Sequence, residues 1–192
     1  MGRPKQLLPW GKTTLLGHAV TRALHTEAKT VTVVLGAHGD RIKKEMTFNG
    51  VTVVHNPRWQ SGLGSSIACG VKHLLAHHND SKGILIMLAD QPFIRVSYLN
   101  ELIRCFREQP RQIIATSYGK RAGVPAIFGA FYFEALSRLQ DDEGARSMIG
   151  KHAADVLALD PGPVADIDTP EAYRTLYHHH FNTPPPDKGQ TE

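Results

Sequence analysis

Short apolar, β-branched runs alternate with longer segments of helical periodicity along most of this chain. Six runs have the pattern of strands: 31–35, 51–54, 83–89, 112–116, 125–128 and 155–159. The run 83–89 is the most apolar and is typical of a strand buried on both faces of a parallel sheet. Helical patterns occupy seven other segments: 13–26, 38–47, 64–78, 95–107, 130–138, 143–151 and 169–178. This alternation predicts an α/β fold, in which helices cover both faces of a mostly parallel sheet.

Length and composition indicate one globular domain. The chain has 192 residues, of which 41% are apolar and 21% charged. No run approaches the roughly 20 apolar residues of a membrane span, and the N-terminus has no secretory apolar stretch. We therefore expect a cytoplasmic protein without a membrane partner, in which Cys69 and Cys105 are reduced thiols.

The chain is basic, with a net charge of +4 and a pI near 9.1, which fits an anionic ligand. Its Lys and Arg residues are scattered, so a nucleic-acid partner is not expected. The composition changes after Tyr177, first to three histidines and then to Pro184–Pro186. This change predicts a domain over residues 1–177 and a disordered tail over 178–192, whose histidines either bind a metal or are simply solvated.

Cations and small residues mark two candidate phosphate-binding loops. The first contains Arg3 and Lys5 and is followed at once by a helical pattern, but the segment taken alone is better explained as a frayed basic terminus. The second leads to Gly64, Ser65 and Ser66, which would form the first turn of a helix. Its small residues let a ligand approach the backbone, although a Gly/Ser loop with a Ser N-cap would look the same.

Acidic residues mark two further loops. Asp90 follows the most apolar strand, where a carboxylate is costly to bury unless it meets a cation, so it is a candidate Mg²⁺ ligand or a helix cap. Alternation places Asp166 and Asp168 on one side of an extended segment before Pro170. Either Asp168 or Thr169 can cap the helix that begins there, and Asp168 becomes a second candidate metal ligand beside Asp90.

Taken together, these segments resemble the molybdenum-cofactor nucleotidylyltransferases, the MobA-like NTP transferases, and most closely their cytidylyltransferase branch. The similarity covers about residues 1–177 and follows the family's order of motifs. The matching motifs are Met1-Gly2-Arg3-Pro4-Lys5-Gln6-Leu7-Leu8, Asn56-Pro57 with Gly62-Leu63-Gly64-Ser65-Ser66, Leu88-Ala89-Asp90-Gln91-Pro92, Gly123-Val124-Pro125-Ala126-Ile127-Phe128, Asp142-Glu143-Gly144-Ala145-Arg146 and Asp166-Ile167-Asp168-Thr169-Pro170. The resemblance implies a Rossmann-like nucleotidyltransferase fold.

The resemblance also implies a reaction: transfer of CMP from CTP to a molybdopterin-type cofactor, with release of pyrophosphate. Lys5 matches the lysine that neutralises the triphosphate, and Asp90 and Asp168 match the carboxylates that hold Mg²⁺. Gln91 favours CTP over GTP, and the nucleotide-binding set would comprise Arg3, Lys5, Gly64, Ser65, Ser66 and Gln91. A client molybdoenzyme is a further expected partner.

The chain departs from the family pattern in two ways. Val124 stands where the family often has a His, which leaves the acceptor open, including a sugar phosphate or another small phosphate. The family's first strand and Gly-rich loop have no counterpart before Lys5. Two explanations stay open: a start site upstream of Met1, or a truncated, non-catalytic module that binds a cofactor or a client enzyme.

Overall fold

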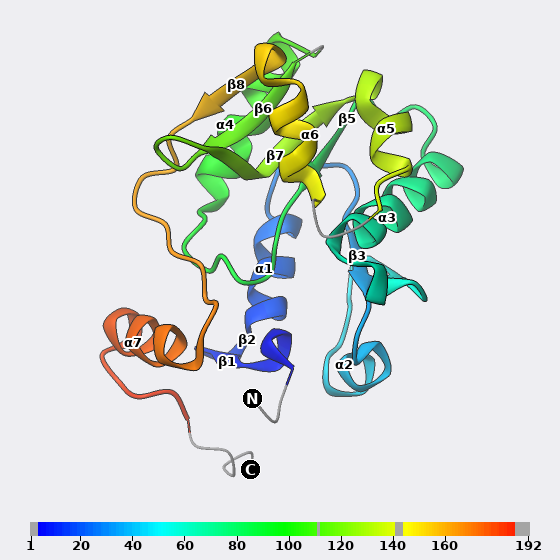
Figure 1. Cartoon of the computed structure of the whole chain (residues 1–192). Helices are drawn as coiled ribbons and strands as arrows, with labels where there is room; N and C mark the ends of the chain where they lie inside the picture. The colour runs from blue at the N-terminus through cyan, green and yellow to red at the C-terminus, as the bar shows by residue number, and fades with distance from the viewer. Residues whose placement is uncertain (1–3, 111, 141–143, 187–192) are drawn as a thin grey trace.

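The computed structural model describes residues 4–110, 112–140 and 144–186 (Figure 1). The α-helices are α1 (Leu15–Leu24), α2 (Gly39–Glu45), α3 (Leu63–His77), α4 (Val96–Glu108), α5 (Phe133–Ser137), α6 (Gly144–Lys151) and α7 (Pro170–Phe181). The strands are β1 (Pro9–Trp10), β2 (Thr13–Thr14), β3 (Thr32–Leu35), β4 (Thr52–His55), β5 (Gly83–Ile86), β6 (Ile113–Ser117), β7 (Ala122–Gly129) and β8 (Val156–Leu159). Short 3₁₀ turns lie at η1 (Lys5–Leu7), η2 (Trp59–Ser61), η3 (Ala130–Tyr132) and η4 (Ala153–Asp155).

The larger strands form a four-stranded sheet in the order β5-β7-β6-β8 and a separate parallel pair, β3 and β4. In the larger sheet β7 is antiparallel to both β5 and β6, while β6 and β8 are parallel. Strands β5, β6 and β8 therefore run in one direction. The predicted α/β class is confirmed, and the neighbouring β1–β2 hairpin is an addition that the apolar pattern did not predict.

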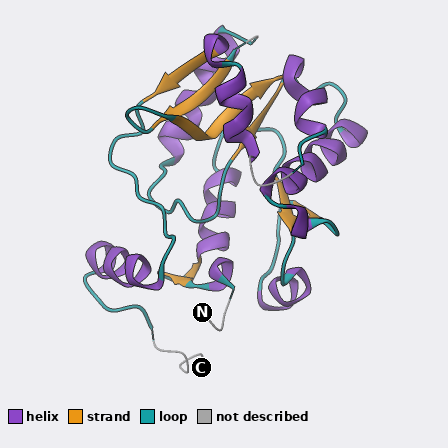
Figure 2. Cartoon of the chain, viewed as in Figure 1, coloured by secondary structure: helices purple, strands orange, loops and turns teal. Residues whose placement is uncertain are grey.

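Helices cover both faces of the four-stranded sheet, as the sequence predicts (Figures 1 and 2). Successive residues of one strand enter different cores: Ile113 packs toward α3 and α6, whereas Ile114 packs toward α4. Both side chains are 0% exposed. This two-sided burial explains the continuous apolar runs, because neither face of such a strand meets water.

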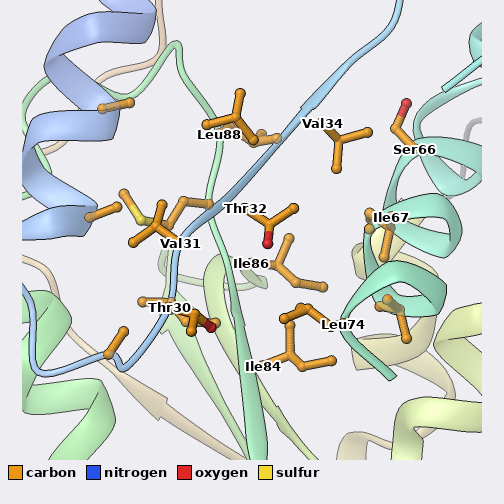
Figure 3. A pocket seen from close by; sticks show the side chains of 18 of the residues that line it. Thr30, Val31, Thr32, Val34, Ser66, Ile67, Leu74, Ile84, Ile86 and Leu88 are labelled. Atoms are coloured by element: carbon orange, nitrogen blue, oxygen red, sulfur yellow. The ribbon is translucent and has the colours of Figure 1, made fainter. Parts of the chain in front are cut away.

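A cavity of about 1020 Å³ lies between β3 and β5 and is lined mainly by apolar side chains (Figure 3). Val31, just before β3, and Thr32 and Val34 of that strand line it from one side, and Ile84 and Ile86 of β5 line it from the other. Helices α1 and α3 supply its other walls. Among the described residues β3 pairs with β4 and β5 with β7, so this cavity separates the two sheets.

Several predicted boundaries differ from the structure, and two of these differences bear on the site and on the C-terminal segment. The strand expected over 83–89 ends at Ile86, and the chain then leaves the sheet toward Asp90. Helix α7 continues to Phe181, so residues 178–181, which composition assigned to a disordered tail, are helical. The physical reason is an aromatic contact: the Phe181 ring lies 5.4 Å from that of Trp10 and 4.5 Å from that of Tyr177. Within the described ranges of the chain, no helix is long and apolar enough to cross a membrane.

Candidate active site

Lys5 is held in place by the short turn η1 rather than fraying from the chain. Leu7, at the end of this turn, is 0% exposed and packs with Val33 and Leu35 of β3. The backbone N–H of Leu7 donates to the carbonyl of Pro4 at 2.9 Å. Burial of Leu7 therefore fixes the segment that carries the Lys5 ammonium.

The Lys5 ammonium joins two acidic loops that are distant in sequence. Its Nζ lies 2.7 Å from Oδ2 of Asp90 and 3.2 Å from Oδ1 of Asp168. The Asp90 side chain is 25% exposed, whereas that of Asp168 is 73% exposed. One cation thus links a half-buried carboxylate to one that faces solvent.

Backbone contacts bring the two acidic loops together. The N–H of Ile167 donates to the carbonyl of Asp90 at 2.9 Å, and the Ile167 side chain is 0% exposed. Thr169 caps α7, because its Oγ1 accepts a hydrogen bond from the N–H of Ala172 at 3.1 Å. The structure therefore assigns the cap to Thr169 and leaves Asp168 available to Lys5.

The ion pairs change the titration of Lys5. Burial opposes the charged ammonium and lowers its pKa, while the bonds and charges of Asp90 and then Asp168 raise it. The net effect is a pKa above the ordinary value of 10.5. Lys5 is therefore a permanent cation at neutral pH, suited to charge neutralisation and not to proton transfer.

A second polar cluster surrounds Gln91, whose side chain is 7% exposed. Its Nε2 donates to the hydroxyl of Tyr118 at 2.8 Å and to Oδ1 of Asp166 at 3.0 Å. The Tyr118 hydroxyl in turn donates to the carbonyl of Val124 at 2.6 Å. Gln91 thus lies beside Val124, the position where the sequence departs from the family pattern.

Burial shifts the pKa values of both ionisable groups in this cluster. It raises the pKa of Tyr118 to about 12, with a further contribution from the charge of Asp166. It also raises the pKa of Asp166, to which the charges of Asp90 and Asp168 add, while the bond from Gln91 lowers it. The charged form of the Asp166 carboxyl group is therefore less stable here than it would be in solvent.

Ser65 and Ser66 lie at the start of α3 and share a hydrogen-bond donor. Asn56 Nδ2 donates to Ser65 Oγ at 2.9 Å and to Ser66 Oγ at 3.0 Å. The Ser65 hydroxyl also lies within hydrogen-bond distance of the carbonyls of Gly62 and Arg58, at 2.8 and 2.9 Å. Ser65 is thus engaged in local structure, whereas Ser66 and Gln6 both line the cavity between β3 and β5.

The structure brings together Lys5, Asp90 and Asp168, and places Gln91 next to them in sequence. It holds Gly64, Ser65 and Ser66 in the first turn of α3, as the sequence predicts, while Arg3 and the motif residues Asp142 and Glu143 lie outside the described residues. The sequence did not assign a role to Tyr118 or Asn56, and it did not predict that Asp166 accepts a hydrogen bond from Gln91. Only the Asn56-Pro57 motif gave a sign of the Asn56 contact; Tyr118 stands in a turn without a motif.

Asp90 provides the test of whether a divalent cation fits this site. Its Oδ2 faces Lys5, while its Oδ1 is buried and has no hydrogen-bond partner among the described residues. A buried carboxylate oxygen without a partner is costly, and a hard cation is the ligand that would satisfy it. Mg²⁺ is often bound by one or two carboxylates together with substrate phosphates, so Asp90 and Asp168 fit that group.

The fold is that of the Rossmann-like α/β nucleotidyltransferases. The chain belongs to the family of the MobA-like NTP transferase domain, whose model matches residues 1–156. The nicotine blue oxidoreductase of Paenarthrobacter nicotinovorans is 31% identical over 189 residues, covering 92% of this chain and 90% of that protein. The purine catabolism protein PucB of Bacillus subtilis is 35% identical over 118 residues, and the match spans 55% of its length.

Solved structures share the fold. A manganese complex of Rv0371C from Mycobacterium tuberculosis H37Rv superposes with a TM-score of 0.74 at 30% identity, covering 92% of this chain and 93% of that one. A nucleotidyl transferase from Methanothermobacter superposes with a TM-score of 0.77 at 19% identity, covering 93% of this chain and 85% of that one. The second likeness concerns the fold alone.

Proposed function

We propose that this chain is a Mg²⁺-dependent cytidylyltransferase that transfers CMP from CTP to a molybdopterin-type cofactor. The observation that carries the proposal is the position of Lys5 Nζ, 2.7 Å from Asp90 and 3.2 Å from Asp168. A fixed ammonium beside two carboxylates provides the charges that a metal-bound triphosphate requires. Family membership supports the reaction class.

The reaction needs charge neutralisation and positioning rather than a protein nucleophile. A phosphate oxygen of the acceptor forms a bond to the α-phosphorus of CTP. The bond from that phosphorus to the bridging oxygen breaks, and pyrophosphate leaves with the electron pair. Lys5 would stabilise the negative charge that spreads over the phosphates. Mg²⁺, held by Asp90 and Asp168, would supply further positive charge to the same oxygens.

The remaining nucleotide-binding assignments follow the motifs. We propose that Gly64 and Ser66 contact the nucleotide. Ser65 would instead hold the start of α3 in place through its hydrogen bond with Asn56. Gln91, in the Asp-Gln-Pro motif, favours CTP over GTP as the substrate. Its Oε1 is a buried acceptor without a partner among the described residues. Arg3 would add a cation to the phosphate site, and a client molybdoenzyme would receive the product.

Pyrophosphate release tests this function directly. The full chain is mixed with each nucleoside triphosphate, Mg²⁺ and molybdopterin cofactor, and the pyrophosphate formed is measured. Release that requires CTP and the cofactor supports the proposal, and release with a sugar phosphate would reassign the acceptor. No release with any triphosphate and any of these acceptors would refute it.

A non-catalytic binding module is the second candidate function. The cavity of about 1020 Å³ favours it, because Gln6, next to Lys5, lines this space and the sheet behind the site is interrupted. Calorimetry separates the two candidates. Cofactor binding without nucleotide, in a chain that releases no pyrophosphate, supports the module; CTP–Mg²⁺ binding that is lost in Asp90→Ala contradicts it.

A further inference from the structure

Four large apolar side chains are exposed among the described residues: Leu24, Trp59, Leu63 and Phe131. Two of them, Trp59 and Leu63, lie four positions apart at the turn that leads into α3, and they are 41% and 43% exposed. The second indole of the chain, that of Trp10, is only 2% exposed. Exposed apolar side chains that gather beside a candidate site mark a surface for a ligand.

The Trp59 side chain lies at the carboxyl end of β3. Gly36 follows the last residue of that strand, and a Cβ built on Gly36 would lie 2.6 Å from the Cβ of Trp59. Any side chain at position 36 would therefore displace Trp59. Leu35, the preceding residue, packs with Leu7 of the turn that also contains Lys5. Trp59 thus lies at the same end of β3 as the segment that carries the Lys5 ammonium.

Hydrogen bonds hold the turn that carries Trp59. The carbonyl of Trp59 accepts a hydrogen bond from the N–H of Gly62 at 3.2 Å, and the N–H of Arg58 donates to Oδ1 of Asn56 at 3.0 Å. The hydroxyl of Ser65 lies 2.9 Å from the carbonyl oxygen of Arg58. A ligand that contacts the indole therefore meets a side chain on an ordered turn, which lowers the entropic cost of binding.

Ser66 lies near the same end of β3. Figure 3 shows Ser66 of α3 beside Val34, near the end of β3, whereas Leu74 lies toward the other end of α3. Trp59 and Ser66 line the same space. The loop therefore offers a flat apolar ring from Trp59 together with a hydroxyl from Ser66, the residue proposed above to contact the nucleotide.

A nucleoside triphosphate has two chemically different ends, and the charged groups of the site suit only one of them. Lys5 and the cation site at Asp90 suit the phosphates, which gain nothing from an indole. The base is a flat aromatic ring, and bases stack favourably on aromatic side chains. The exposed Trp59 ring therefore fits the base end of the nucleotide.

We propose that Trp59 stacks on the cytosine ring of CTP and holds the base while Lys5 and the cation site hold the phosphates. This inference rests on the proposed function, because it takes CTP as the nucleotide. Every base has an aromatic face, so stacking raises affinity without distinguishing bases. Trp59 therefore contributes affinity, and the choice of CTP over GTP remains with Gln91.

Tryptophan emission of the full chain tests the contact. The probes are CTP with Mg²⁺ and inorganic tripolyphosphate with Mg²⁺, which has the phosphates but no base. CTP should quench the emission of the wild-type chain, and tripolyphosphate should not. The response to CTP should disappear in Trp59→Phe, in which Trp10 is the remaining indole and is shielded from the ligand.

Affinities measured by calorimetry separate stacking from a structural role. Trp59→Leu should bind CTP about tenfold more weakly, with tripolyphosphate affinity retained, and Trp59→Phe should keep most of the CTP affinity because it keeps an aromatic ring. In the pyrophosphate assay Trp59→Leu should raise KM for CTP and leave kcat nearly unchanged. Equal CTP affinity in wild type and Trp59→Leu, or a parallel loss of tripolyphosphate affinity, would overturn the proposal.

Phe131→Leu is the matched control. Phe131 is 79% exposed and lies close after Gly129, which pairs with Gly83 at the start of β5, whereas Asp90 follows the other end of that strand. This variant should bind CTP as the wild type does. A loss equal to that of Trp59→Leu would mean that exposed apolar residues act on binding without contact, which contradicts stacking.

The two assays distinguish this inference from the proposed function. CTP that quenches Trp59 without any pyrophosphate release with the molybdopterin cofactor refutes the transfer reaction and supports the stacking. CTP-dependent release with an unchanged emission and an unchanged KM in Trp59→Leu refutes the stacking alone. Quenching by the cofactor without CTP would place the acceptor at Trp59 and also overturn the inference.

Discussion

The ammonium of Lys5 lies 2.7 Å from Asp90 Oδ2, although 85 positions separate the two residues in the chain. The contact joins the turn η1 to the loop that follows β5. Asp90 Oδ1, on the same carboxylate, is buried without a partner among the described residues. One carboxylate thus offers an oxygen to the protein's own cation and another to a further cation.

Replacing Lys5 tests charge neutralisation. Lys5→Met should lower kcat for CTP-dependent pyrophosphate release by roughly 10²-fold, because one preorganised electrostatic contact to the developing charge is lost. The matched control is Lys12→Met, an exposed lysine seven positions later, which should retain activity. Steady-state kinetics measures both, and equal rates for the two variants would contradict the role of Lys5.

Replacing the two carboxylates tests the cation site. Asp90→Asn should weaken Mn²⁺ or Mg²⁺ binding in the presence of CTP by about tenfold or more, because the side chain that offers the buried Oδ1 is no longer charged. Asp168→Asn should have a smaller effect, since its side chain is 73% exposed. Calorimetric titration gives the affinities, with exposed Asp80→Asn as the control. The reverse order of effects would reassign the principal ligand.

The serine pair at the start of α3 should separate stability from nucleotide binding. Ser65→Ala should lower the free energy of unfolding by about 1–3 kcal/mol, because Asn56 and two carbonyls lose a buried hydroxyl partner. Ser66→Ala should instead raise KM for CTP with a smaller loss of stability. Urea denaturation and kinetics on both variants check this division, which fails if Ser65→Ala changes only KM.

His18 should make stability depend on pH. Burial lowers its pKa below 6.5, and the charges of Arg22 and His180 lower it further, while the Pro92 carbonyl raises it. Arg22 Nε donates to His18 Nε2 at 2.8 Å when that nitrogen carries no proton, whereas Nε2 donates to the Pro92 carbonyl, 3.1 Å away, only when it is protonated. The folded state therefore binds fewer protons than the unfolded state below pH 6.5, so stability falls as the pH drops through the folded pKa.

His18→Gln should flatten this loss of stability. Unfolding midpoints in urea between pH 5 and pH 8 measure the effect, and His25→Gln, at the C-cap of α1, is the control. A wild-type slope that persists in His18→Gln would assign the pH dependence to another group.

The end of α7 should contribute measurably to stability. Phe181→Ala should destabilise the fold by about 1–3 kcal/mol, because the contacts with Trp10 and Tyr177 are lost. His179→Ala, on the exposed side of the same helix, should have little effect. Thermal or urea unfolding measures both, and equal stabilities would mean that residues 178–181 are dispensable.

Local pattern was sufficient to predict the main strands and helices. Ile113 and Ile114 show why: adjacent residues enter different cores, so a strand with two buried faces is apolar throughout. The end of α7 and the β1–β2 hairpin were not predictable in this way. Both involve Trp10, whose ring contacts with Phe93, Tyr177 and Phe181 join segments more than 80 residues apart and leave no periodic signal.

The sequence by itself determined the α/β class, the family and the candidate residues Lys5, Asp90 and Asp168, because these follow from apolar periodicity and short motifs. Tertiary structure decided which residues meet: Thr169 rather than Asp168 caps α7, Asp166 pairs with Gln91, and Lys5 joins both acidic loops. It also placed Trp59 beside Gly36, at the end of β3. Contacts between distant segments depend on how the helices and sheets pack, and no local pattern encodes that arrangement.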